Sequence, residues 1–369
     1  MRKRRFNSSF SWSNVLRVLV VGMLAMAMSQ SGVAQSGPAI GAAQRTEILF
    51  LGTAGGPPLR VERSEPATLL IVDGRPYLID CGIGTVQRLL QAHIASEDIH
   101  TIFFTHLHAD HDLGLADVMG NDFFRLNALR SQQTISIYGP PQTKDLVDAG
   151  FHYITFGFTA FAADYGAIRA GLVNGELKSP FVAHEIPHGG LAYQDDNIRV
   201  TAAENTHYAL MQPEDRKRMK SYSYRIQTAH GVVVFTGDTG PSDAVTQLAK
   251  GADVLVSEVE NLDEVAKIGA RDLNHLPPEA MAAWMAHMRQ EHMDQAQVGD
   301  MATKAQVKSV VLYHYSPANP KAYVAKVKEH FSGPVFAPAD LDRYCLAPDG
   351  KSPSDSTVLS SCGNAATRK

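Results

Sequence analysis

The chain has 369 residues, of which 44% are hydrophobic and 20% charged, enough to bury a sizeable core in one large domain or two smaller ones. Its 34 basic and 38 acidic residues give a net charge of −4. This balance argues against a general nucleic-acid binder, which needs excess positive charge, although a local basic patch would be compatible with it.

Residues 1–34 have the pattern of a secretory signal peptide. Four basic residues at positions 2–5 precede an apolar stretch from Val15 to Met28, and small residues at 32–34 form a cleavage pattern. A membrane anchor is the alternative, but the stretch is short for a full span. We therefore expect cleavage, a periplasmic or secreted protein and no stable membrane anchor. Cleavage removes five basic residues and leaves a net charge of −9, which further disfavours nucleic acid as a partner.

The chain after this leader begins with short strands. Residues 35–46 are rich in Gly, Ala and Ser and predict a flexible lead-in. Residues 47–51 predict a strand that ends in a glycine-rich turn. No Lys-Ser/Thr pair follows, so we expect a turn beside a site rather than a phosphate-binding loop. Asp73-Gly74, between the apolar runs 67–72 and 76–80, predicts a β-hairpin.

A dense cluster of potential metal ligands follows a predicted helix over residues 85–93 and the apolar run 99–104. Residues 105–111 read Thr-His-Leu-His-Ala-Asp-His, with three histidines and one carboxylate within six positions. Imidazole nitrogens and carboxylate oxygens are ligands that Zn²⁺ takes. The alternative is a chance cluster on a surface loop. Because so short a turn cannot wrap around a single ion, we expect two ions, or one ion with spare ligands, completed further along the chain.

The middle of the chain predicts a helix, a strand and a second helix, over residues 113–126, 134–138 and 142–156. Residues about 158–180 are rich in Phe, Ala and Gly without a clear period, and we interpret them as an insertion or lid. Aromatic side chains nearby would line a substrate pocket, form a homodimer face or pack into a core. They are Phe151, Tyr153, Phe156, Phe158, Phe161 and Tyr165.

The second half of the chain predicts alternating strands and helices. The predicted strands cover residues 181–186, 198–202, 221–228, 231–235, 253–257 and 309–313, with a short last strand at 335–337. The predicted helices cover residues 242–250, 295–304 and 323–331, and a further helix opens with the segment 273–279 and runs to about residue 289.

The three cysteines have different expected states. Cys81 lies within an apolar strand pattern and is expected to be a buried free thiol. Cys345 and Cys362 would form a disulfide in an oxidising periplasm, and two unpaired thiols are the alternative. Residues 347–369, which include Cys362, are rich in Ser and Gly and predict a mobile tail.

One pattern recurs along the chain: apolar strands end abruptly in a potential ligand. Each residue alone is compatible with a turn or a hydrogen-bonded cap. Because strand ends at one edge of a layered fold converge, five such residues predict a shared site. They are Asp80, His106, His207, Asp238 and His314.

This ordered set resembles the metallo-β-lactamase superfamily, and it is closer to the ribonuclease Z and arylsulfatase-like branch than to true β-lactamases. The resemblance covers residues 47–346 and implies an α/β fold, a four-layer αββα sandwich with two mixed sheets between helices. It implies a dinuclear metal site whose ligands are His106, His108, Asp110, His111, His207, Asp238 and His314. The metal pair would be zinc, and manganese or iron would also suit these ligands.

The resemblance also assigns roles. His106, His108 and His207 would hold one ion; Asp110, His111 and His314 would hold the second, and Asp238 would bridge them. Asp80 would orient a ligand histidine. A hydroxide between the ions would attack the substrate, with Asp110 orienting it. His275, on a loop before a predicted helix, would protonate the leaving group.

The leading interpretation is an exported, dinuclear zinc-dependent hydrolase that cleaves a small phosphodiester, sulfate ester, carboxylic ester or lactone. True β-lactamases of the common type have Cys where Asp238 stands, which argues against antibiotic hydrolysis. The alternatives are a ribonuclease Z-like phosphodiesterase or nuclease, and a non-catalytic metal-binding protein. We could not identify the Gly/Pro-rich arm with which bacterial ribonuclease Z grips tRNA. That gap, the acidic charge and the predicted export all disfavour tRNA as the substrate.

Overall fold

The computed structural model describes residues 45–56, 58–128, 133–164, 179–316, 319–346 and 359–362. The predicted signal peptide, nearly all of the lead-in, and Tyr165 lie outside these ranges. Among the described helices, none combines the length and apolar character that crossing a membrane requires.

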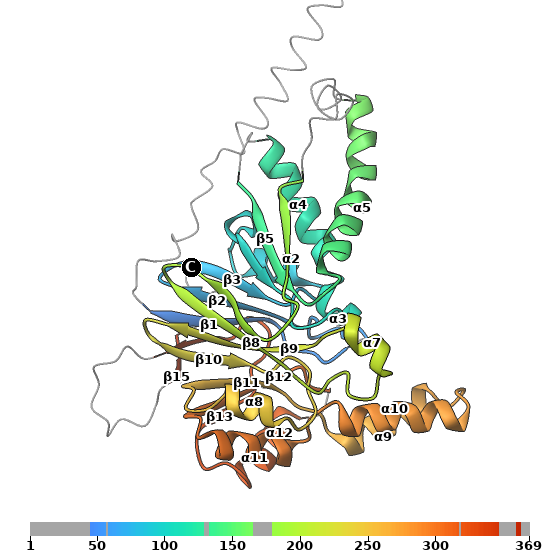
Figure 1. Ribbon diagram of the computed structural model, residues 1–369, viewed down its shortest axis with the longest axis vertical. Helices are drawn as coiled ribbons and strands as arrows, with labels where there is room; N and C mark the ends of the chain where they lie inside the picture. The colour runs from blue at the N-terminus through green and yellow to red at the C-terminus, as the bar shows by residue number, and fades with distance from the viewer. Residues whose placement is uncertain are drawn as a thin grey trace, which may run out of the picture. The chain divides into compact units, whose positions relative to one another are not determined.

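Two mixed β-sheets form the centre of the fold (Figure 1). The first sheet has the strand order β15-β14-β1-β2-β3-β4-β5-β6. Its strands in chain order are β1 (Thr46–Gly52), β2 (Ala67–Val72), β3 (Arg75–Ile79), β4 (Thr101–Phe103), β5 (Ile135–Gly139), β6 (Phe181–Glu185), β14 (Arg343–Leu346) and β15 (Leu359–Ser361). The predicted hairpin joins β2 and β3, and both Asp73 and Gly74 have positive φ, as a type I′ turn requires.

The second sheet has the order β13-β12-β11-β10-β9-β8-β7. Its strands are β7 (Gly190–Gln194), β8 (Ile198–Glu204), β9 (Tyr222–Thr228), β10 (Gly231–Phe235), β11 (Val254–Glu258), β12 (Ser309–Tyr313) and β13 (Val335–Phe336). Strands β10 to β13 are parallel neighbours, while β7 to β10 are antiparallel.

Alternation along the central strands of the second sheet creates two apolar cores. Val233 and Val256 belong to a core shared with side chains of the first sheet, such as Phe50. Val234 and Leu255 point to the other face and pack with residues of flanking helices. This period of two is what a strand buried on both faces produces.

Helices cover the outer faces of both sheets (Figure 1). Those associated with the first sheet are α2 (Thr85–Gln91), α4 (Leu115–Ala128) and α5 (Thr143–Asp164). Those packed on the second sheet are α8 (Asp243–Leu248), α11 (Gln295–Ala305) and α12 (Pro320–Lys328). The arrangement of helices, two sheets and helices confirms the predicted fold class.

Five further helices complete the described part of the chain. They are the 3₁₀ helix η1 (Ser96–Asp98), α3 (Ala109–Asp112), α7 (Pro213–Arg218), α9 (Leu262–Asp272) and α10 (Pro278–Gln290). Figure 1 shows α9 and α10 side by side, projecting from the second sheet. Our sequence analysis did not predict α3, α7, α9, β7 or β14.

Two boundary predictions are corrected. The segment read as an irregular insertion from residue 158 is helical up to Asp164, because its alanines favour helix and α5 packs against α4 and β6. The tail beginning at residue 347 contains β15, which pairs with β14. The predicted Cys345–Cys362 disulfide is present and ties this strand in place. Cys81 is a buried free thiol, as predicted, and burial raises its pKa.

Candidate metal centre

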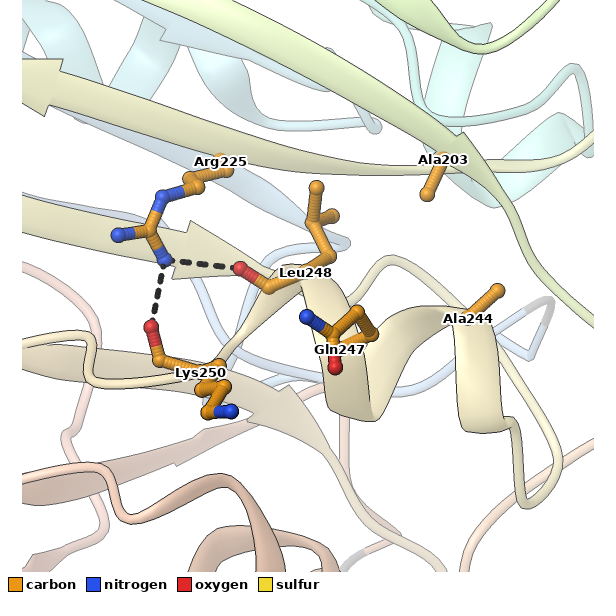
Figure 2. A pocket seen from close by; sticks show the side chains of 6 residues that line it. All are labelled: Ala203, Arg225, Ala244, Gln247, Leu248 and Lys250. Atoms are coloured by element: carbon orange, nitrogen blue, oxygen red, sulfur yellow. Dashed lines mark hydrogen bonds between the residues drawn. The ribbon is translucent and has the colours of Figure 1, made fainter.

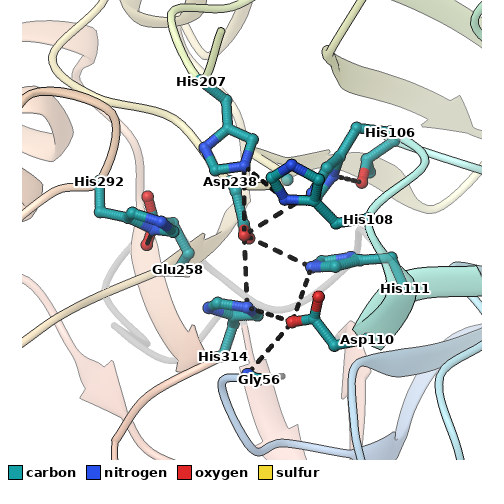
Figure 3. A network of polar contacts seen from close by, with 12 residues as sticks. Gly56, His106, His108, Asp110, His111, His207, Asp238, Glu258, His292 and His314 are labelled. Carbon is teal, nitrogen blue, oxygen red and sulfur yellow. Dashed lines mark hydrogen bonds and ion pairs between the residues drawn. The ribbon is translucent and has the colours of Figure 1, made fainter. Parts of the chain in front are cut away.

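All seven predicted metal ligands lie together at one edge of the two sheets (Figure 3). They are carried by the turn after β4, by α3, and by the segments that follow β8, β10 and β12. His108 is the N-cap residue of α3, and the short helix turns Asp110 and His111 inward, where both are buried. The convergence of strand ends therefore produces the predicted cluster.

The ligand atoms fall into two groups of three. His106, His108 and His207 form one group and Asp110, His111 and His314 form the other; within each, the atoms lie within 4.8 Å of one another. This is the grouping that the sequence resemblance implies.

Asp238 lies between the two groups. Its Oδ2 atom is 3.4 Å from Nε2 of His111 and 3.3 Å from Nε2 of His314. The same oxygen is 3.8 Å from Nε2 of both His106 and His207. One carboxylate thus approaches histidines of both groups, which is the position of a bridging ligand.

Several buried atoms of this cluster have no hydrogen-bond partner within the described part of the chain. They include Nε2 of His106, Nε2 of His111 and Oδ1 of Asp238. Leaving a buried polar atom unpaired costs about 1–3 kcal/mol. Metal ions would satisfy these atoms, and three histidine and carboxylate donors on each side suit zinc-like ions. The residues therefore fit a pair of metal ions.

Hydrogen bonds fix the ring orientations of two ligands. Nδ1 of His111 donates to Oδ2 of Asp80 at 2.9 Å, and Asp80 also accepts the backbone N–H of Thr105 at 2.8 Å. Nδ1 of His207 donates to the carbonyl oxygen of Glu291 at 3.0 Å. Each bond places the proton on Nδ1 and leaves Nε2 with a lone pair for a metal. Asp80 thus orients a ligand histidine, as the resemblance implies.

The electrostatics differ between the two ligand groups. Burial lowers the pKa of both His111 and His314, but the Asp238 carboxylate outweighs burial and raises the pKa of both rings. Burial lowers the pKa of His106 and of His207 well below the usual value, so both rings are neutral, the form that binds metals. Burial raises the pKa of Asp238, but the neighbouring His314 and His111 outweigh it and hold that pKa well below its usual value. The carboxylate is therefore ionised.

The glycine-rich turn after β1 lies against the cluster, as predicted. The backbone N–H of Gly56 donates to Oδ2 of Asp110 at 3.1 Å. A Cβ atom at Gly56 would lie 2.2 Å from Cβ of Asp110, so a larger residue cannot occupy this position without displacing the carboxylate. Gly56 was not singled out from sequence, although the glycine run was its signal.

The structure does not bring His275 to the metal cluster. This residue is exposed on the turn between α9 and α10, at the end of that helix pair pointing away from the sheets (Figure 1). The prediction relied on a loop histidine before a helix. Because α9 and α10 form a projecting pair, they carry this loop outward, and the predicted role of His275 does not fit the geometry.

His292 occupies the position expected of that histidine. It is buried, and its ring centroid lies 4.9 Å from that of His207 and 6.0 Å from that of His314. Its Nδ1 lies 3.0 Å from Oε2 of Glu258, at the end of β11. His292 also precedes a helix, because Asp294 caps α11 with a capping box. That sequence signal could have identified it.

A broader surface depression lies apart from this cluster. It has a volume of about 520 Å³ and is lined by Ala203, Arg225, Ala244, Gln247, Leu248 and Lys250 (Figure 2). The Arg225 guanidinium donates to the carbonyl oxygens of Leu248 and Lys250. With no histidine, cysteine or carboxylate in its lining, this depression offers no comparable chemistry.

Comparison with known proteins gives a family match. Residues 75–315 match the family described as the beta-lactamase superfamily domain. Ribonuclease Z of Mycobacterium bovis is 28% identical over 306 residues, which cover 82% of this chain and 99% of that protein. Ribonuclease Z of Thermococcus onnurineus is 27% identical over 317 residues, which cover 80% of this chain and 93% of that protein.

Solved structures show the same fold. A metallo-beta-lactamase fold protein from Bacillus subtilis aligns with a TM-score of 0.57 and 17% identity, over 82% of this chain and 99% of that one. The short form of human tRNase Z aligns with a TM-score of 0.53 and 20% identity, over 80% of this chain and 98% of that one. At these identities the likeness concerns the fold alone.

Proposed function

Since the chain belongs to the beta-lactamase superfamily and is a hydrolase of that superfamily, we propose that it is a metal-dependent phosphodiesterase of the ribonuclease Z type. The observation that carries the proposal is the placement of Asp238 between two groups of three ligands. The ribonuclease Z relatives, matched over nearly their full length, support this alternative over the small-ester hydrolase favoured by sequence analysis.

Two metal ions held by these residues would supply a hydroxide at neutral pH and would neutralise charge on the oxygens of a phosphodiester. Zinc suits the donor set, and manganese or iron would also suit it. The protein's own groups do the remaining work. Asp80 and the Glu291 carbonyl hold His111 and His207 in place, and Asp110 is positioned by the N–H of Gly56.

His292 is the group that donates a proton to the leaving oxygen. Burial lowers its pKa, but the Glu258 carboxylate outweighs this effect and the pKa rises to about 10. The imidazolium form, which carries the proton to be donated, is therefore present at neutral pH. Its ring lies beside those of His207 and His314, and its Nε2 lies 3.3 Å from Nε2 of His287.

A substrate panel tests the proposed function. The full chain, loaded with zinc, is assayed against bis-p-nitrophenyl phosphate, a 3′-extended tRNA, p-nitrophenyl sulfate, p-nitrophenyl acetate and a lactone. We expect cleavage of phosphodiesters that is abolished in Asp238→Asn. Hydrolysis of the sulfate, acetate or lactone with inert phosphodiesters would overturn the proposal. Cleavage of the aryl phosphodiester without the tRNA would restrict it to small substrates.

We also propose that the protein is exported. The leader pattern in residues 1–34 motivates this location, and the Cys345–Cys362 disulfide supports it because disulfides persist in oxidising compartments. Cell fractionation with intact mass measurement tests it. A mature chain beginning at Gln35 outside the cytoplasm is expected, and an uncleaved chain confined to the cytoplasm would contradict it.

A further inference from the structure

We propose that a small cavity beside His108 binds a planar aromatic ring that belongs to the part of the phosphodiester retained after the leaving group departs. This inference rests on the proposed function and specifies its substrate class. The cavity has a volume of about 210 Å³ and adjoins the metal cluster through His108. Pockets for drug-sized ligands are about 300–1,000 Å³, so this cavity suits a single ring system.

The position of the cavity relative to the proton donor suggests which part of the substrate it receives. Figure 3 shows His108 and His292 on either side of Asp238. His292 would protonate the leaving oxygen, so the leaving group lies on its side. The cavity, on the side of His108, is then available to the group that stays on phosphorus.

His108 and Tyr208 connect the cavity to the cluster. Nδ1 of His108 lies 3.1 Å from Nε2 of His207, so this ring belongs to the ligand group and also forms a cavity wall. The Tyr208 ring, only 9% exposed, lies 5.2 Å from the His108 ring. A ring bound in the cavity would therefore lie directly beside the metal-binding residues.

The rest of the lining is mostly apolar and suits an aromatic ring. Leu107, Pro140 and Pro141 contribute aliphatic surface, and Met211 and Met219 contribute thioethers. Methionine sulfur makes favourable contacts with aromatic rings and adapts to their shape. Aromatic rings gain from burial against such surfaces, whereas a methyl group fills little of the space.

The polar lining residues add selectivity without demanding a second charge. Lys220 forms an ion pair with Glu204 at 2.8 Å. Gln142 has a φ of 82°, which non-glycine residues rarely adopt, and its N–H donates to Glu185 at 2.8 Å. Strained backbone of this kind is found where a side chain must be held for function. The side-chain amide of Gln142 carries both N–H donors and a carbonyl acceptor.

Three substrates with the same leaving group test the inference. They are the p-nitrophenyl esters of methyl phosphate, phenyl phosphate and thymidine 5′-phosphate, compared by kcat/KM. The variant is Met219→Trp, at a partly exposed position where the larger side chain would fill the cavity. The control is Leu191→Trp, which adds the same side chain at an exposed apolar position of β7 outside the lining.

Met219→Trp is expected to lower the phenyl-to-methyl ratio of kcat/KM by roughly tenfold or more, as loss of a ring-sized apolar contact does. Leu191→Trp is expected to keep the wild-type ratio. Because the ratio is compared between proteins, the intrinsic reactivities of the two esters cancel. An unchanged ratio in Met219→Trp would overturn the inference. If the wild-type chain has a higher kcat/KM for the thymidine ester than for the phenyl ester, and Met219→Trp loses this preference, the ring is a nucleobase. If the wild-type chain shows no such preference, the ring is a simple aryl group.

A binding measurement separates this inference from the proposed function. Calorimetry with phenylphosphonate and methylphosphonate needs no turnover. The ring site is supported if the wild-type chain binds phenylphosphonate more tightly than methylphosphonate and Met219→Trp removes this difference. This result would stand even if no phosphodiester were cleaved and the proposed function were wrong. Equal affinities of the two phosphonates for the wild-type chain overturn the ring site, whatever the turnover.

Discussion

The carboxylate of Glu258 links His292 to the loop that carries Asp238. Its Oε2 lies 3.0 Å from Nδ1 of His292, while Oε1 accepts the backbone N–H groups of Thr239 and Met293 at 2.9 and 3.2 Å. Glu258 is fully buried, so this carboxylate has few alternative partners. One side chain at the end of β11 thus fixes the proposed proton donor relative to the loop of Asp238.

Replacing His292 and His275 in turn should show which of the two histidines donates the proton. His292→Ala is expected to lower kcat by about 10²- to 10⁴-fold on substrates with poor leaving groups, because general-acid catalysis contributes that much. The loss should be much smaller with p-nitrophenolate, which departs without a proton. His275→Ala should retain wild-type rates, because this side chain is exposed on a distant turn. Comparable losses in both variants would refute the assignment.

Replacing Glu258 by Gln should change the pH dependence of kcat. Burial lowers the pKa of His292 and the Glu258 carboxylate raises it, so Glu258→Gln removes the raising effect. A general acid works only while protonated, so a lower pKa means that activity is lost at a lower pH. The alkaline limb of the kcat profile is expected to shift toward neutral pH. Glu279→Gln, at an exposed position of α10, serves as the control and should leave the limb unmoved.

Metal content should depend on Asp238. Asp238→Asn keeps the shape of the side chain but removes the charge that faces four histidines. We expect mass spectrometry to find at least one proposed ion lost and activity reduced by at least about 100-fold, the upper end for loss of a supporting partner. Asp300→Asn, whose native carboxylate pairs with His330 at the surface, should keep its metal. Full metal content and rate in Asp238→Asn would refute the bridging role.

The disulfide should stabilise the sheet edge. Cys345 and Cys362 are 17 residues apart, and closing a loop of this size stabilises a fold by about 3 kcal/mol through the unfolded chain. Cys345→Ser and Cys362→Ser should each lower the free energy of unfolding by about this amount in urea titrations. The double variant should lose no more than either single one, since all three remove one bond. Additive losses would argue against this source of stability.

Local patterns predicted most of the strands and helices, and the family resemblance supplied their arrangement as a sandwich. Asp73-Gly74 specified its hairpin, because a two-residue turn with positive φ needs such residues. Continuous apolar runs predicted buried strands correctly, because such a run needs burial on both faces whichever strand lies beside it. Short polar elements such as α7 were missed, since propensity alone does not distinguish them from loops. Strand β15 was missed because its three residues, Leu359–Ser361, carry no apolar run.

The sequence by itself predicted which residues lie together, because each candidate ligand terminates or closely follows an apolar strand and such ends meet at one edge of the sheets. The family resemblance supplied their proposed roles as metal ligands. Only the tertiary structure decided which histidine accompanies them. His292 is positioned by Glu258, a partner 34 residues away, whereas His275 is carried outward by α9 and α10. The cavity beside His108 likewise combines three separate segments of the chain. Local periodicity predicts where a strand ends. The contact of His292 with Glu258 and the lining of the cavity depend instead on long-range packing, which no local pattern encodes.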